Sequence, residues 1–98
     1  MPKTLPQIFA IKKVIAEADG IKTLVFEGNL NFTPGQFVMV WLPNCDEKPY
    51  GVWRNNKKEF CITVAEVGSF SKKLAQQKVG SQIGIRGPFG RGFTVPKK

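Results

Sequence analysis

The chain contains no histidine and only two cysteines, Cys45 and Cys61, which excludes several kinds of site. Without histidine there is no Ser–His or Cys–His pair for nucleophilic catalysis. The two cysteines lack a paired zinc-ligand spacing, and no histidine is present to complete a site. One disulfide is possible by number alone, but we expect two reduced structural thiols. The sequence therefore predicts no metal site and no catalytic residue of these classes.

Long hydrophobic runs are also absent. No stretch approaches the roughly 20 apolar residues of a membrane-spanning helix. The start, Met1-Pro2-Lys3-Thr4, lacks the apolar segment of a secretory signal. We therefore expect a cytoplasmic protein with no membrane partner. Its 98 residues, of which 42% are hydrophobic and 22% charged, predict a single globular domain over residues 1–98.

Acidic residues are in the minority: 7 stand against 15 lysines and arginines, for a net charge of +8. Such an excess attracts nucleic acid, anionic lipid or an anionic cofactor. The basic residues are scattered in pairs along the chain and form no dense basic arm. We interpret most of them as solvated lysines, so that nucleic acid is a less favoured partner.

The chain does contain a succession of short strand patterns separated by turn residues. The expected strands are Ile8–Ala18, Lys22–Glu27, Gln36–Leu42, Tyr50–Trp53, Glu59–Val67 and Ser81–Arg86. After Gly68 the period changes, because Phe70 and Leu74 stand four residues apart, and this predicts one helix over roughly Ser69 to Lys78. Six short strands with one helix predict an all-β fold, a closed or nearly closed antiparallel barrel.

The third expected strand alternates three large side chains with two valines, so that one set faces the interior. Large residues at strand spacing are usually core, and we expect Phe37, Met39 and Trp41 to face inward. Trp53 has two open roles: it extends an aromatic platform, or it plugs one end of the barrel.

Four motifs follow one another along this pattern: Pro34-Gly35-Gln36-Phe37, Lys48-Pro49-Tyr50-Gly51, Gly68-Ser69-Phe70-Ser71 and Gly87-Pro88-Phe89-Gly90. In this order they resemble the flavin-binding barrel of the ferredoxin reductase superfamily, above all the electron-transfer subunits of dihydroorotate dehydrogenases. The resemblance implies a six-stranded antiparallel Greek-key barrel that binds FAD, with FMN less favoured. The last motif is the turn that closes this domain in the family. We therefore expect the FAD-binding domain alone, without the nicotinamide-binding domain and the iron–sulfur segment of such relatives.

The same resemblance assigns roles to the second motif. Lys48-Pro49-Tyr50-Gly51 stands where the family has Arg-x-Tyr-Ser, whose tyrosine packs on the flavin ring, whose arginine meets the phosphates and whose serine lies near flavin N5. Tyr50 would then cover the ring and Lys48 would reach a phosphate, whereas Gly51 lacks the hydroxyl. The residues alone also allow a turn that enters a strand with Tyr50 in the core.

The third motif opens the predicted helix. Free amides at a helix start bind anions, and the family holds the cofactor pyrophosphate with a glycine-containing turn and a Ser or Thr. The resemblance therefore assigns Gly68, Ser69 and Ser71 to the cofactor site. A plain N-cap, in which Ser69 or Ser71 satisfies its own helix, is the alternative.

Together these observations predict a flavin-binding, electron-transfer module of an NAD(P)H-dependent oxidoreductase that is catalytically incomplete by itself. Its partner would be a nicotinamide-binding domain or a catalytic dehydrogenase subunit on another chain. Two other functions stay open. One is a basic barrel that binds single-stranded nucleic acid by stacking on Trp41, Trp53 and Phe89. The other is a cofactor-free barrel that serves subunit contacts.

Overall fold

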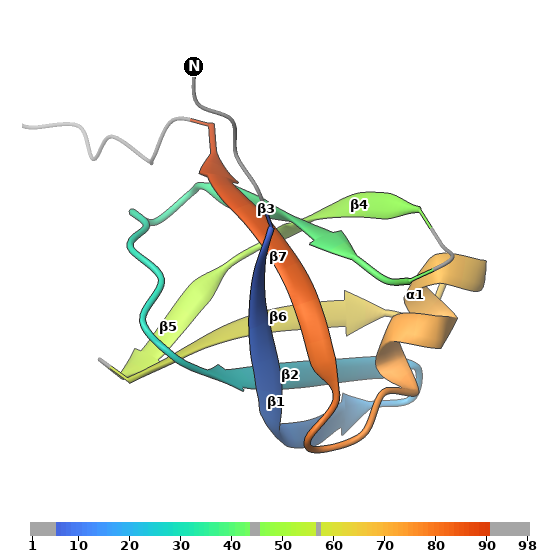
Figure 1. Ribbon diagram of the computed structural model, residues 1–98. Helices are drawn as coiled ribbons and strands as arrows, with labels where there is room; N and C mark the ends of the chain where they lie inside the picture. Colours follow the sequence, from blue (N-terminus) through green and yellow to red (C-terminus); the bar gives the residue numbers. More distant parts are fainter. Residues whose placement is uncertain (1–5, 44–45, 57, 91–98) are drawn as a thin grey trace, which may run out of the picture.

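The computed structural model describes residues 6–43, 46–56 and 58–90. Its elements are β1 (Gln7–Ala18), β2 (Ile21–Glu27), β3 (Phe37–Trp41), β4 (Glu47–Gly51), β5 (Trp53–Asn56), β6 (Glu59–Ala65), α1 (Ser69–Ala75) and β7 (Gln82–Phe89) (Figure 1). Every strand pair is antiparallel, in the order β4-β3-β7-β1-β2-β6-β5. The predicted antiparallel barrel with one short helix is confirmed. Among the described residues no ladder joins β4 to β5, so the barrel is open between these two edges.

The long strand β1 curls the sheet into a barrel. Residues 7–10 pair with β7, and residues 11–18 pair with β2 across two irregularities in register. Such irregularities bend a strand and increase its twist. The half-sheet β4-β3-β7 therefore folds over the half-sheet β2-β6-β5, as Figure 1 shows.

The core forms where the inner faces of the two half-sheets meet. In β2, Leu24 and Phe26 are fully buried in this core, and Thr23 lies on the other face of the strand, as the alternation predicts. The ring of Phe26 stacks on that of Phe60 with 5.1 Å between centroids. The buried apolar residues that join β1, β3, β6, β7 and α1 to this cluster include Ile11, Val38, Val40, Phe60, Ile62, Val64, Leu74, Ile83 and Ile85.

The inward face of β3 is opposite to the prediction. Val38 and Val40 are fully buried, whereas the large side chains face outward and Trp41 is 38% exposed. Trp41 has room outside because it stands opposite Gly84 in β7, where a Cβ atom would lie 2.9 Å from the indole ring. The absence of a side chain at Gly84 therefore lets a large ring lie flat on the outer surface.

The described residues form seven strands where six were expected, because the predicted strand Tyr50–Trp53 is two strands. β4 begins earlier, at Glu47, and pairs with β3, whereas the chain after Val52 pairs with β6. Pro49 fits within β4 because an edge strand has one side without ladder hydrogen bonds.

Two other predicted boundaries were wrong. The helix ends at Ala75 rather than near Lys78. The last strand continues to Phe89 instead of ending before a Gly87–Gly90 turn, and its Phe89 pairs with Phe37 of β3. Gly87 and Gly90 both have a positive φ, 124° and 85°, a conformation that glycine adopts readily.

Cys61 is a buried free thiol on β6, and burial raises its pKa. This agrees with the expected structural thiol, whereas Cys45 and Phe93 lie outside the described residues. Within the described ranges, no three His, Cys, Asp or Glu side chains gather in a way that could hold a metal ion. No helix in that part of the chain has the length and apolar character needed to cross a membrane.

Candidate functional site

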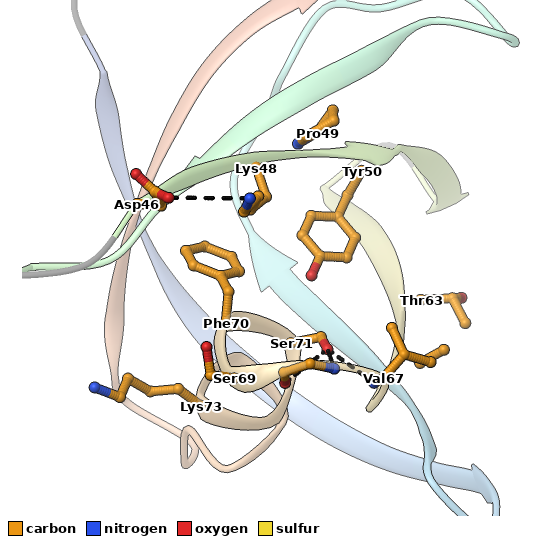
Figure 2. A pocket seen from close by; sticks show the side chains of 12 residues that line it. Asp46, Lys48, Pro49, Tyr50, Thr63, Val67, Ser69, Phe70, Ser71 and Lys73 are labelled. Carbon is orange, nitrogen blue, oxygen red and sulfur yellow. Dashed lines mark hydrogen bonds and ion pairs between the residues drawn. The ribbon is translucent and has the colours of Figure 1, made fainter.

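A cavity of about 710 Å³ lies between β4 on one side and the end of β6 with α1 on the other. This volume is within the range of small-molecule sites, about 300–1,000 Å³. Two segments far apart in the sequence meet there, 46–50 and 67–73 (Figure 2). The lining includes every predicted binding residue except Gly51: Lys48, Pro49, Tyr50, Gly68, Ser69 and Ser71.

Tyr50 forms the aromatic wall of the cavity. Its side chain is partly buried and packs against the core, and its ring reaches from β4 toward α1 (Figure 2). The Phe70 ring lies 6.3 Å away between centroids, with 24° between the ring planes. Burial raises the pKa of the Tyr50 phenol, so its hydroxyl stays protonated at neutral pH and remains a hydrogen-bond donor. Tyr50 is thus both a packing residue and a wall of the cavity.

The packing of its buried side chains holds helix α1 beside the cavity. Phe70, Leu74 and Ala75 are buried against β6 and β2. At the other end of the helix, Lys22 Nζ of β2 donates a hydrogen bond to the carbonyl oxygen of Ala75 at 3.1 Å. This contact satisfies one of the carbonyl groups that a helix end leaves without a partner. The start of the helix is therefore held at the cavity mouth.

Ser71 uses its hydroxyl to organise the start of its own helix. The Ser71 Oγ atom accepts hydrogen bonds from the amides of Val67 and Gly68, each at 2.9 Å, and lies 3.2 Å from the Gly68 carbonyl oxygen, to which it donates. The alternative role as a capping residue is therefore present in the structure. Ser69 is exposed at the mouth, next to first-turn amides that helix geometry leaves without an intrahelical acceptor.

Two lysines from different elements line the cavity. Lys48 Nζ on β4 lies 3.9 Å from Asp46 Oδ2, and both side chains are largely exposed, so this ion pair is weak. Lys73 stands on α1, on the other side of the cavity (Figure 2). Sequence reasoning missed Lys73 because it was grouped with the solvated lysines. The signal that could have found it is its spacing, since Lys73 follows Ser69 by four residues and shares its helix face.

Gly51 does not line this cavity, so the structure does not bring it together with the other residues predicted to bind the cofactor. Alternation along β4 turns it away from Tyr50, into a second hollow of about 380 Å³ that Trp53 also lines. Trp53 is 43% exposed, so it does not plug the barrel. Thr63 on β6 lines both hollows and was not predicted. No local signal marks it, because its position depends on which strands stand beside β6.

An ion pair on the outer face secures the strand that carries Lys48 and Tyr50. Arg86 of β7 donates to both carboxylate oxygens of Glu47 in β4, at 2.8 Å and 2.7 Å. These bonds span β3, which lies between the two strands. The hydrogen bond from Arg86 lowers the pKa of Glu47 below its ordinary value. The edge strand β4 is thus tied to β7, on the other side of β3.

Solved structures share this fold. Phthalate dioxygenase reductase, described as modular for electron transfer from pyridine nucleotides to [2Fe–2S], superposes with a TM-score of 0.79 at 15% identity, over 95% of this chain and 32% of that one. The cytochrome b5 reductase domain of Ulva prolifera nitrate reductase gives 0.74 at 18% identity, over 87% of this chain and 40% of that one. At these identities the likeness is one of fold.

Curated relatives are more similar in sequence. The probable dihydroorotate dehydrogenase B (NAD(+)), electron transfer subunit, of Methanocaldococcus jannaschii is 47% identical over 88 residues, which are 90% of this chain and 33% of that protein. The protein of the same name from Thermococcus kodakarensis is 41% identical over 88 residues, covering 89% of this chain and 36% of that protein. The chain thus spans about a third of the length of these relatives.

The family model of the oxidoreductase FAD-binding domain matches residues 21–93, a range that includes β2 to β7 and the whole lining of the cavity. The fold, the order of the motifs and the relatives agree with this match. The chain therefore belongs to the oxidoreductase FAD-binding domain family, of the ferredoxin reductase type.

Proposed function

We propose that this chain holds FAD in the cavity between β4 and α1 and serves as the flavin-carrying part of an NAD(P)H-dependent electron-transfer unit. One observation carries the proposal. The two segments that the family likeness assigns to the cofactor, Lys48–Tyr50 and Gly68–Ser71, line the same cavity although they are far apart in the chain. When bound, a flavin supplies a store of reducing equivalents.

The lining residues fit a flavin nucleotide in shape and charge. Tyr50, with Phe70 near it, offers flat apolar surface for a ring. Lys48 and Lys73 offer positive charge on two sides of the cavity, and Ser69 stands between them at the helix start. Two lysines match the two phosphates of FAD better than the single phosphate of FMN. We therefore propose FAD as the natural cofactor.

The partner follows from the length of the relatives. They are named electron transfer subunits of an NAD(+)-dependent dehydrogenase, and this chain matches about a third of each. We propose that a nicotinamide-binding domain or a catalytic dehydrogenase subunit on another chain completes the unit. In this arrangement residues 1–98 form a single FAD-binding domain that binds and orients the flavin, and the partner exchanges electrons with it.

The structure disfavours the nucleic-acid alternative. Stacking along a strand of nucleic acid needs aromatic rings in succession. Trp41 pairs with Gly84 at one end of β3, and Phe89 pairs with Phe37 at the other end, roughly 13 Å away along the strand. The ring of Phe89 also lies beside that of Phe37 and beneath the guanidinium of Arg86. These rings do not form one platform.

A flavin titration tests the proposal. The purified chain is mixed with FAD, FMN or riboflavin, and binding is followed by tryptophan fluorescence and by the flavin absorbance band near about 450 nm. We expect affinity to fall in the order FAD, FMN, riboflavin, because phosphates are lost in that order. Oligothymidine is titrated in the same way, as the ligand of the nucleic-acid alternative. A chain that keeps its circular dichroism spectrum but binds no flavin would instead support the cofactor-free barrel.

A further inference from the structure

A line of hydrogen bonds crosses four neighbouring strands and ends at the cavity wall. The indole N–H of Trp53 on β5 donates to Thr63 Oγ1 on β6 at 3.2 Å. Thr63 Oγ1 lies 3.2 Å from Thr23 Oγ1 on β2, and Thr23 Oγ1 donates to Glu17 Oε2 on β1 at 2.6 Å. Because β5, β6, β2 and β1 are adjacent in the sheet, the line runs directly across it.

The chemistry of the two ends sets the direction of every bond in this line. An indole N–H only donates, an ionised carboxylate only accepts, and each hydroxyl has a single proton. Thr23 gives its proton to Glu17, so it accepts one from Thr63. Thr23 is 1% exposed, so its own hydroxyl is shielded from water, although Glu17 and Thr63 on either side of it are exposed. Thr63 therefore has no proton left for a ligand, but its oxygen keeps a lone pair that Trp53 does not use.

Thr63 stands where the ring of a flavin fits. It lines both hollows, sharing the first with Tyr50 and the second with Trp53. Figure 2 shows it at the opposite end of the cavity from Lys73. The lysine end suits phosphates, and the aromatic end suits a planar ring. A hydroxyl that only accepts is therefore presented at the ring end.

We infer that Thr63 Oγ1 accepts a hydrogen bond from the N3–H group of the flavin ring, and that Trp53, Thr23 and Glu17 are positioning residues that keep this oxygen an acceptor. The inference rests on the proposed function. The oxidised isoalloxazine ring has one N–H donor, at N3, and its other polar ring atoms accept. A freely rotating hydroxyl would serve either kind of atom, whereas the hydroxyl of Thr63 selects N3–H.

The experiment compares four variants of the full chain. Thr63→Val removes the oxygen at nearly constant volume, and Thr63→Ser restores it. Thr23→Val keeps the Thr63 oxygen but frees its proton to face the ligand. Thr33→Val is the matched control, because Thr33 is exposed in the loop before β3 and lines neither hollow. Each protein is titrated with FAD, and the N3 proton of ¹⁵N-labelled FAD is observed by NMR.

We expect Thr63→Val to weaken FAD binding by about 2- to 10-fold, the effect of one neutral hydrogen bond, and to move the N3 proton resonance upfield. Thr63→Ser should restore both properties, and Thr33→Val should match the wild type. Thr23→Val should move the resonance toward that of Thr63→Val. A merely structural role of the hydroxyl line would not move this resonance.

Failure of the inference is distinct from failure of the proposed function. If all proteins bind FAD with equal affinity and share one N3 resonance, the hydrogen bond is absent although the FAD site stands. If Thr63→Val does not fold, the Thr23→Val variant still tests the inference. An N3 resonance there that matches the wild type would show that Thr23 does not keep the Thr63 oxygen an acceptor. If the folded wild type binds no FAD, the proposed function fails and the inference fails with it.

Discussion

Replacing Lys48 and Lys73 by alanine, singly and together, tests the phosphate end of the cavity. A unit charge 4 Å from another contributes about 1 kcal/mol in a water-like medium and about 4 kcal/mol at an effective dielectric constant of 20. Lys48 is 51% exposed and its ammonium also faces Asp46, so the lower figure applies. We expect each substitution to weaken FAD binding by about 1 kcal/mol, roughly fivefold. The two losses should add, because the lysines stand on different elements.

The assay is a fluorescence titration with FAD and with riboflavin at two salt concentrations. Riboflavin has the same ring without phosphates, so its affinity should not change in either variant. The loss for FAD should shrink as salt rises, because the screening length falls from about 30 Å at 0.01 M to about 10 Å at 0.1 M. Lys13→Ala is the control, since Lys13 is an exposed lysine on β1 that lines neither hollow.

Two results would refute this reasoning. An equal loss of affinity for riboflavin and FAD would mean that the lysines shape the cavity and do not meet phosphates. If the folded double variant binds FAD as tightly as the wild type does, both lysines are solvated surface residues that do not contribute to FAD binding. Either result would leave the aromatic wall as the part of the site still to be tested.

The remaining predictions address the ring wall, the second hollow and the edge strand. Tyr50→Ala should weaken the binding of FAD and of riboflavin alike by about tenfold, because the ring of Tyr50 provides the contact. Tyr50→Phe keeps the ring and should bind both nearly as the wild type does. A loss of affinity for FAD alone would contradict this. Gly51→Ser should fold, because nothing lies within 4 Å of a Cβ atom there. Gly51 lines the second hollow, which shares Thr63 with the cavity, so in flavin-loaded protein a serine hydroxyl should shift the reduction potential by some tens of millivolts with little change in FAD affinity. Identical potentials would show that residue 51 does not face the flavin. Glu47→Gln should lower the free energy of unfolding, measured with urea, because the hydrogen bond from Arg86 lowers the pKa of Glu47 in the folded state. That advantage of the wild type is present above the ordinary carboxylate pKa and is lost as the pH falls through the lowered folded value, so a difference that is constant with pH would count against the ion pair.

Local sequence signals were enough to predict the strand pattern and the start of the helix, whereas the segments of the site were predicted from the family resemblance. Turn residues separate the strands, and alternation predicts that Leu24 and Phe26 share one face, which the structure places in the core. The serine at position 71 was predicted near a helix start, where its hydroxyl accepts hydrogen bonds from the amides of Val67 and Gly68, just before the helix. The resemblance implied that Tyr50 covers a flavin ring, and the structure places Tyr50 in the lining of the cavity. The strand and helix patterns depend on residues only a few positions apart in the chain.

Contacts between distant segments decided the rest. Trp41 faces outward because Gly84, on a strand much later in the chain, leaves room for its ring. The strand expected over Tyr50–Trp53 is interrupted at Val52 because β4 and β5 pair with different strands. Thr63 offers only an acceptor because Glu17 lies two strands away across the sheet. Periodicity reports which residues share a face, but strand pairing determines what stands opposite each of them, and only the folded barrel specifies that pairing.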